Sequence, residues 1–250
     1  MDTYGLIGFP LKHSFSAKFF TDKFEREKID AEYLNFELED IGDIREVLLQ
    51  NPQLKGLNVT IPYKERIFPF LDEVSPEARK IGAVNVIKVY RQHANSKHYR
   101  LSGFNTDYIG FRQSLLPLIN SDFHKNALIL GTGGASKAVA QVLTDMQIEW
   151  RLVSRTPGKD KLTYGDLSPE VMAGHGIIVN ASPVGTFPHT NGCPDIPYDL
   201  LSPHHLLYDL VYNPEVTLFL QKGKEQGTVI KNGREMLELQ ALAAWDIWKK

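Results

Sequence analysis

A glycine-rich segment is the first place where residue types and spacing suggest chemistry. The sequence Gly131-Thr132-Gly133-Gly134-Ala135-Ser136 follows an apolar run at 127–130 that predicts a strand, and a helical pattern begins directly after it. Such a turn binds the pyrophosphate of a nucleotide, because N–H groups at a helix N-terminus attract the anion and glycine permits its close approach. Ser136 replaces the third glycine of the G-x-G-x-x-G pattern, so a tight turn without a ligand is the alternative.

The end of the next predicted strand, 150–153, indicates which dinucleotide would bind. Sites for NAD usually carry Asp or Glu here, and its carboxylate binds the ribose 2′-hydroxyl. This chain has Ser154-Arg155-Thr156, with Lys159 close behind. A cation beside hydroxyl groups suits the 2′-phosphate of NADP, which a carboxylate would repel. We therefore expect NADP, with a solvated basic turn as the alternative.

A second group of polar residues lies in the segment Asn58-Val59-Thr60-Ile61-Pro62-Tyr63-Lys64. Asn58 and Thr60 point the same way at the carboxyl end of a predicted strand, where open α/β sheets place their ligands. Lys64 is expected on the first turn of a helix that begins at Pro62. These side chains suit a polyhydroxylated substrate. The alternative is two strand-end polar residues and a surface lysine.

Four other polar residues have both a functional and a local structural interpretation. Asp107 ends the string Gly103-Phe104-Asn105-Thr106-Asp107 and is either a site residue or a helix N-cap. Ser14 and Ser16 precede a phenylalanine-rich helical pattern, in which Ser16 is a plausible N-cap. Gln240 interrupts the apolar face of the last predicted helix, so its amide needs partners, either backbone groups or a ligand hydroxyl.

The elements that must position these residues alternate between strand and helix. In the first half the expected strands are 3–8, 33–38, 56–61 and 83–90, and the expected helices are 16–28 and 41–50. In the second half the expected strands are 127–130, 150–153, 176–180 and 206–210, and the expected helices are 107–118, 137–146 and 235–248. This alternation predicts an α/β fold, with a Rossmann-like unit in the second half.

The composition excludes several classes of partner. The 250 residues are 42% hydrophobic and 23% charged, which predicts a packed chain. The formal net charge of -2 provides no field for nucleic acid or an anionic membrane. The single cysteine, Cys193, and the spacing of the histidines provide no disulfide or metal motif. Without a signal-like N-terminus, we expect a cytoplasmic monomer or homodimer that acts on a small molecule and needs no metal.

Taken together and in this order, the motifs resemble the shikimate dehydrogenase family over nearly the whole chain. The two most specific strings are N-V-T-x-P-[YF]-K at 58–64 and G-x-N-T-D at 103–107. The other segments that carry the resemblance are Gly8-Phe9-Pro10, His13-Ser14-Phe15-Ser16, Gly82-Ala83-Val84-Asn85, Gly131 to Ser136, Ser154-Arg155-Thr156, Asn180-Ala181-Ser182-Pro183 and 236–240. The chain departs from the commoner pattern at Thr132, Ser154 and Lys159, where alanine, asparagine and a second arginine are frequent.

The resemblance implies a two-domain enzyme. A substrate-binding catalytic domain at 1–103, completed by a C-terminal helix at 233–250, would hold shikimate, and a Rossmann-like domain at 104–232 would hold NADP. The implied reaction is the reversible NADPH-dependent reduction of 3-dehydroshikimate to shikimate, a step in aromatic amino acid biosynthesis. Lys64 and Asp107 match the catalytic positions, and we expect a coupled proton-transfer and positioning pair without allotting the proton to either residue.

The resemblance also implies the ligand contacts, residue by residue. Ser14 and Ser16 match the residues that bind the shikimate carboxylate. The substrate's hydroxyl groups are matched by Asn58, Thr60, Asn85, Asp107 and Gln240, and Tyr212 matches a substrate-contacting tyrosine. The cofactor contacts match Gly131, Thr132, Gly133, Gly134, Ala135, Ser154, Arg155, Thr156, Lys159, Leu210 and Gly233.

Three alternatives remain at this point. A quinate/shikimate dehydrogenase with dual substrate or NAD use would share these motifs. A methylene-tetrahydrofolate dehydrogenase-like enzyme would share the fold, but a folate pocket does not need this set of polar residues. A non-catalytic NADP-binding module is disfavoured because Lys64 and Asp107 are both present.

Overall fold

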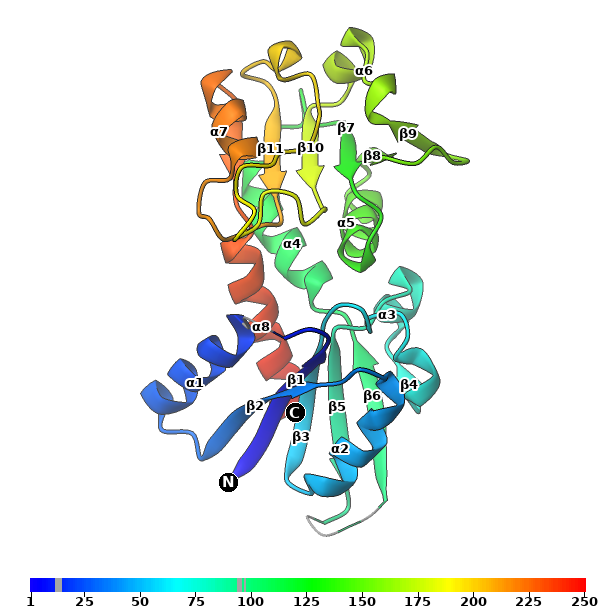
Figure 1. Cartoon of the computed structure of the whole chain (residues 1–250), viewed down its shortest axis with the longest axis vertical. Coiled ribbons are helices and arrows are strands. Elements are labelled where there is room, and N and C mark those ends of the chain that lie inside the picture. The colour runs from blue at the N-terminus through cyan, green and yellow to red at the C-terminus, as the bar shows by residue number, and fades with distance from the viewer. Residues whose placement is uncertain (12–14, 94–95, 97) are drawn as a thin grey trace. The chain divides into compact units, whose positions relative to one another are not determined.

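A computed structural model describes residues 1–11, 15–93, 96 and 98–250. The chain folds into two compact units, each built around its own six-stranded sheet. Met1–Thr106 and Gln240–Lys250 form the first unit, and Asp107–Leu239 form the second. Figure 1 shows helices on both faces of the sheet in each unit, which confirms the predicted α/β class.

The first unit contains a mixed sheet with the strand order β2-β1-β3-β5-β6-β4. Its strands are β1 (Asp2–Gly8), β2 (Ala31–Glu37), β3 (Leu54–Val59), β4 (Glu73–Val74), β5 (Val86–Arg91) and β6 (Tyr99–Phe104). Its helices are α1 (Phe15–Glu27), η1 (Ile41–Asp43), α2 (Ile44–Gln50), η2 (Phe68–Phe70), α3 (Pro76–Ile81) and the part of α8 (Arg234–Lys249) that begins at Gln240. Strand β1 is parallel to β2 and β3, whereas β5 is antiparallel to both of its neighbours.

Two apolar layers hold this sheet. On one face, Phe20 and Phe24 of α1 and Trp245 and Trp248 of α8 pack with Tyr4 of β1. On the other face, the buried side chains of α2 and of the segment after β3 form a separate cluster with β1, β3 and β5. Helix α8 is thereby attached to the first unit, and this packing fixes where Gln240 lies.

The second unit contains a parallel sheet with the order β12-β11-β10-β7-β8-β9. Its strands are β7 (Asn126–Leu130), β8 (Glu149–Ser154), β9 (Lys161–Thr163), β10 (Ile177–Asn180), β11 (Leu206–Asp209) and β12 (Val229–Lys231). Its helices are α4 (Asp107–Leu115), η3 (Leu116–Leu118), α5 (Gly134–Asp145), η4 (Tyr164–Asp166), α6 (Pro169–Gly174), η5 (Tyr198–Leu200) and α7 (Leu218–Glu225). If β7 to β12 are renumbered 1 to 6 and the sheet is followed from β9 to β12, the strand order is 3-2-1-4-5-6, as in dinucleotide-binding sheets.

The apolar strand runs explain why this unit was recognisable in the sequence. Strands β10 and β11 are buried throughout, as parallel strands covered on both faces must be. Helices α4 and α5 pack on one face of the sheet, and α6 and α7 pack on the other. The carboxyl ends of the strands remain as the edge at which such sheets bind ligands.

Several local expectations were wrong. No helix starts at Pro62, because residues 61–67 form consecutive turns before the short η2. Isolated turn bonds form there instead: the Tyr63 N–H donates to the Thr60 carbonyl and the Ile67 N–H donates to the Tyr63 carbonyl, while the Lys64 carbonyl accepts from the distant Val84 N–H. Ser16 is not an N-cap, since it is the second residue of α1. Helix α5 begins at Gly134, three residues before the helix expected at 137.

Candidate active site

The glycine segment forms the turn from β7 into α5. Gly131 has a φ of +109°, and a Cβ there would lie 3.1 Å from the Ser182 nitrogen, so this position needs glycine for both conformation and space. A Cβ on Gly133 would meet nothing within 4 Å, which leaves open space beside the helix end. In the described part of the chain no side chain caps α5 at Gly133. The N–H groups of its first turn, apart from that of Ser136, which donates to the Gly133 carbonyl, therefore fit the pyrophosphate of NADP.

Polar and basic residues follow the neighbouring strand, β8. Arg155, Thr156 and Lys159 are exposed, in the turn between β8 and β9, and Ser154 is partly buried at the strand end. The Ser154 hydroxyl accepts a hydrogen bond from the Thr156 N–H at 3.2 Å, which orders the start of this turn. Exposed cations and hydroxyl groups at this position fit a 2′-phosphate. Their assignment to the cofactor stays a prediction.

In the first unit, three amide side chains that were predicted to bind substrate lie next to one another. The Asn85 Nδ2 donates to the Gln240 Oε1 at 2.8 Å. This side-chain partner explains how an amide can stand on the apolar face of α8. The Asn85 Oδ1 accepts from the Thr106 N–H at 2.7 Å. The Asn58 Nδ2 reaches the Asn85 carbonyl in a long contact of 3.5 Å. Residues from β3, the segment before β5 and α8 thus form one polar cluster.

Tyr33 of β2 extends this cluster to α1. Its hydroxyl donates to the Asn58 Oδ1 at 2.7 Å and accepts a hydrogen bond from the Ser16 side chain. Burial raises the pKa of Tyr33 well above its ordinary value, so the phenol stays protonated and remains a donor to Asn58. Tyr33 therefore links Ser16 to Asn58, and Asn58 is linked in turn to Asn85 and Gln240.

The segment after β3 presents Thr60 and Lys64 on turns. Both residues are half-buried. The Thr60 N–H donates to the Ile7 carbonyl, which ties the turn to the end of β1, and a Cβ on Gly8 would lie only 2.5 Å from the Thr60 methyl. The close approach of these two segments sets where Thr60 projects. The Lys64 carbonyl is held by Val84, so the backbone at Lys64 is fixed even without a helix.

The remaining predicted residues belong to the second unit. Asp107 is the buried first residue of α4. Leu210 and Tyr212 follow β11, and burial raises the pKa of Tyr212 above its ordinary value. A Cβ on the buried Gly233 would lie 2.1 Å from the Leu210 carbonyl oxygen, so only glycine allows this contact. The pairing of Lys64 with Asp107 stays a prediction.

Comparison with known proteins shows where the chain belongs. The family model described as the shikimate dehydrogenase substrate binding domain matches residues 6–87. The protein named shikimate dehydrogenase (NADP(+)) of Carboxydothermus hydrogenoformans is 37% identical over 263 residues, which cover 98% of this chain and 90% of that protein. This chain belongs to the shikimate dehydrogenase family.

Two solved structures of shikimate 5-dehydrogenase support this membership. The Thermus thermophilus enzyme, solved in complex with NADP(H) and shikimate, is 31% identical with a TM-score of 0.83, covering 99% of this chain and 93% of that one. The Listeria monocytogenes enzyme, solved with shikimate and NAD, is 28% identical with a TM-score of 0.83, covering 100% of this chain and 92% of that one. The predicted family is confirmed.

Among shikimate dehydrogenase positions expected from the sequence, Ser14 lies outside the described residues. Tyr33 was missed, although it joins two of the predicted substrate residues. In the sequence Tyr33 was visible only as a tyrosine in an alternating strand pattern, and that pattern does not distinguish a core tyrosine from one near a ligand.

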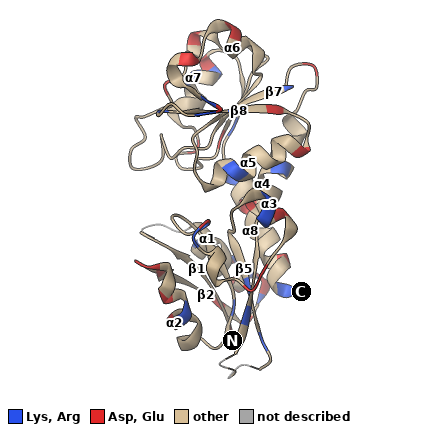
Figure 2. Ribbon diagram, turned by 90° about the vertical axis from the view of Figure 1, so that its right-hand side faces the viewer, with Lys and Arg blue, Asp and Glu red and all other residues tan. Residues whose placement is uncertain are grey.

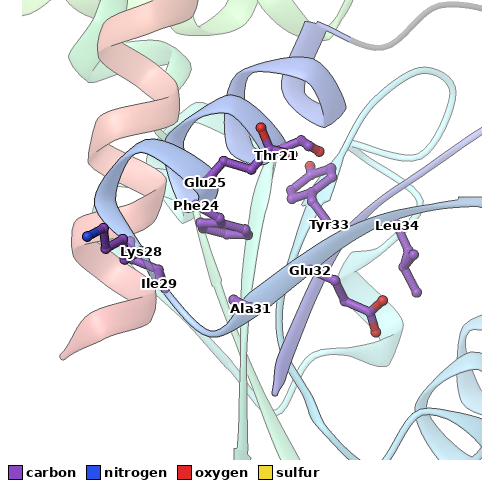
Figure 3. Close-up of a pocket in the computed structure, with 9 residues that line it drawn as sticks. All are labelled: Thr21, Phe24, Glu25, Lys28, Ile29, Ala31, Glu32, Tyr33 and Leu34. Atoms are coloured by element: carbon purple, nitrogen blue, oxygen red, sulfur yellow. The ribbon is translucent and has the colours of Figure 1, made fainter.

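A surface groove of about 460 Å³ lies between α1 and β2 (Figure 3). Its lining includes Tyr33, Glu25 and Lys28 but none of the predicted site residues.

Proposed function

We propose that this chain is a shikimate dehydrogenase that catalyses the reversible NADPH-dependent reduction of 3-dehydroshikimate to shikimate. The observation that carries the proposal is the joined amide cluster of Asn58, Asn85 and Gln240, in a family of NADP-dependent shikimate dehydrogenases. Amides whose own hydrogen bonds are already ordered are well suited to bind several hydroxyl groups in one orientation.

The cofactor would be held by the second unit. The turn Gly131 to Ala135 and the N-terminus of α5 would bind the pyrophosphate, and Ser154, Arg155, Thr156 and Lys159 would bind the 2′-phosphate. Leu210 would lie near the nicotinamide, and Gly233 would lie beside the cofactor. When bound, NADP accepts a hydride from the carbon that carries the reacting hydroxyl, and NADPH returns it.

The protein's own residues would handle the proton and the orientation of the substrate. Oxidation of an alcohol also releases a proton from its oxygen, and we assign this proton to the coupled pair Lys64 and Asp107. Ser14 and Ser16 would bind the carboxylate at the far end of the ring. Thr60 and Tyr212 would join the amide cluster on the hydroxyl groups, and substrate ordered from both ends presents one alcohol for reaction.

We also propose a location and an assembly state for the enzyme. In the described residues no helix is long and apolar enough to cross a membrane, and Figure 2 shows acidic and basic segments interspersed over both units. One cysteine suits a reducing compartment, and we place the enzyme in the cytoplasm as a monomer or homodimer. Sedimentation of the purified chain decides between these two assembly states.

A spectrophotometric assay tests the proposed function. NADPH absorbance is followed with 3-dehydroshikimate, and NADP or NAD reduction is followed with shikimate or quinate. We expect turnover with shikimate and a clear preference for NADP. Comparable turnover with quinate would identify a dual-substrate enzyme. Binding of NADPH without turnover of any substrate would refute the proposal in favour of a non-catalytic binding module.

A further inference from the structure

Asp209, the last residue of β11, has a fully buried carboxylate. Its Oδ1 accepts from the Asn180 Nδ2 at 2.9 Å and from the Val211 N–H at 3.0 Å, and its Oδ2 accepts from the Thr217 hydroxyl at 2.5 Å. Burial raises its pKa to about 6, while the three hydrogen bonds oppose that change. Among the described residues no Lys, Arg or His forms an ion pair with it, so hydrogen bonds alone offset its burial.

These hydrogen bonds connect three segments of the second unit. Asn180, the last residue of β10, accepts from the N–H and the hydroxyl of Ser182 and donates to the Val184 carbonyl. The carboxylate therefore orders residues 181–184 through Asn180 and residues 210–212 through Val211. Thr217 is the N-cap of α7, so its bond to Asp209 orders the start of that helix instead.

Two of the three segments border the place where the nicotinamide half of NADP would lie. In the sheet, β8 lies on one side of β7, and β10 and β11 lie on the other. With the pyrophosphate at the turn after β7 and the 2′-phosphate after β8, the nicotinamide half extends toward the ends of β10 and β11. The Ser182 backbone is in close contact with Gly131, and Gly233 is in close contact with Leu210. The shape of this edge therefore depends on both segments.

We propose that Asp209 is a positioning residue for the cofactor, whose carboxylate holds the segments 181–184 and 210–212 in the shape that accepts the nicotinamide half. The inference rests on the proposed use of NADP. The competing interpretation is that Asp209 only anchors α7. The two bonds on Oδ1 belong to the cofactor edge and the single bond on Oδ2 belongs to α7, so substitutions can separate the two roles.

Three variants make this separation. Asp209→Ala removes both sets of bonds. Thr217→Val removes the bond to Oδ2 and the N-cap bond from the Leu220 N–H but leaves both Oδ1 bonds, and it is the matched control. Asp209→Asn is the conservative variant, because its amide oxygen can keep both Oδ1 bonds while its NH₂ donates to the Thr217 hydroxyl. For each, the NADPH dissociation constant is measured by fluorescence, together with the melting temperature and hydrogen exchange of the Ser182 and Val211 amides without cofactor.

We expect Asp209→Ala to weaken NADPH binding by about tenfold or more, the loss expected when buried hydrogen bonds that order a site are removed. The Ser182 and Val211 amides should exchange faster in this variant. Thr217→Val should lower the melting temperature but keep NADPH binding within about twofold of the wild type, because both Oδ1 bonds remain. Asp209→Asn should restore most of the binding.

The proposal is overturned if Asp209→Ala binds NADPH like the wild type, or if Thr217→Val weakens binding as much as Asp209→Ala. If Asp209→Ala does not fold, Asn180→Ala replaces it, since this change disconnects residues 181–184 and leaves the bonds to Val211 and Thr217. Unchanged NADPH binding in Asn180→Ala would then overturn the proposal. A wild type that binds no NADPH would refute the proposed function as well, whereas a wild type that binds normally confines the failure to Asp209.

Discussion

Replacing Tyr33 by phenylalanine tests whether the polar cluster of the first unit serves the substrate. The ring of Tyr33 stacks on Phe20 at a centroid distance of 4.9 Å, and a phenylalanine would preserve this packing. The change removes only the hydroxyl that donates to the Asn58 Oδ1 and accepts from Ser16. Two residues predicted to bind opposite ends of shikimate would thereby lose the group that connects them.

The expected loss has a stability part and a binding part. Leaving the buried Asn58 oxygen without its donor should lower the free energy of unfolding by about 1–3 kcal/mol. An Asn58 amide that is no longer held should weaken shikimate binding by about 0.5–1.5 kcal/mol, which raises the KM for shikimate roughly two- to tenfold. The first part is measured by urea unfolding followed by tryptophan fluorescence. The second is measured from initial rates at saturating NADP.

Tyr63→Phe is the matched control. Tyr63 is also buried in the first unit, and its hydroxyl donates to the Leu38 carbonyl at 2.5 Å, away from the amide cluster. The family motif N-V-T-x-P-[YF]-K admits phenylalanine at this position. We expect a similar loss of stability with an unchanged KM for shikimate. A wild-type KM in Tyr33→Phe, or an equal rise in both variants, would refute the role given to Tyr33.

Three further predictions address the proton pair, the cofactor and the buried acid. Lys64→Ala should reduce turnover by about 10²–10⁴-fold and keep shikimate binding measurable by calorimetry, because the amine belongs to the proposed proton-transfer pair; wild-type turnover would remove Lys64 from the reaction. Arg155→Ala should raise the KM for NADP about tenfold or more and barely change that for NAD, which lacks the 2′-phosphate; equal increases would mean that Arg155 only supports its turn. The raised pKa of Asp209 means that folding favours its protonated form, and this stability is lost as the pH rises from its ordinary pKa of 3.8 through about 6. Between about pH 4 and pH 7, the free energy of unfolding of Asp209→Asn should therefore rise relative to that of the wild type by up to about 3 kcal/mol, at about 1.4 kcal/mol per pKa unit. Urea unfolding across this pH range measures the difference, and a difference that stays constant with pH would contradict ionisation of a buried Asp209.

The second unit was the easier of the two to predict from the sequence. Its central strands are continuous apolar runs, and Gly131 marks a turn that few other residues could form, so pattern and chemistry agree. The edge elements β9 and β12 are three residues each and were missed, because so short a strand has no measurable period. In the first unit β6 was missed because its buried positions include Ser102 and Gly103, which do not form the apolar pattern of a buried strand.

Lys64 shows why local rules misplace some functional residues. Proline at the start of an apolar, charged stretch is a good helix signal, yet the segment after Pro62 forms turns. The Lys64 carbonyl receives the Val84 N–H from a distant segment, and the sequence near Lys64 contains no sign of this bond. Tertiary hydrogen bonds thus override propensity at the position where a reactive amine is expected.

The partners of the buried polar groups were beyond local prediction for the same reason. Asn85 and Gln240 are 155 residues apart in sequence, and their hydrogen bond exists only because the tryptophans of α8 attach that helix to the first sheet. Asn180 and Asp209 meet because their strands are neighbours in the parallel sheet. A buried amide or carboxylate is stable only when such partners are in place. Each of these polar groups therefore depends on the complete fold of its unit, which is the condition under which a polar site keeps one geometry before its ligand arrives.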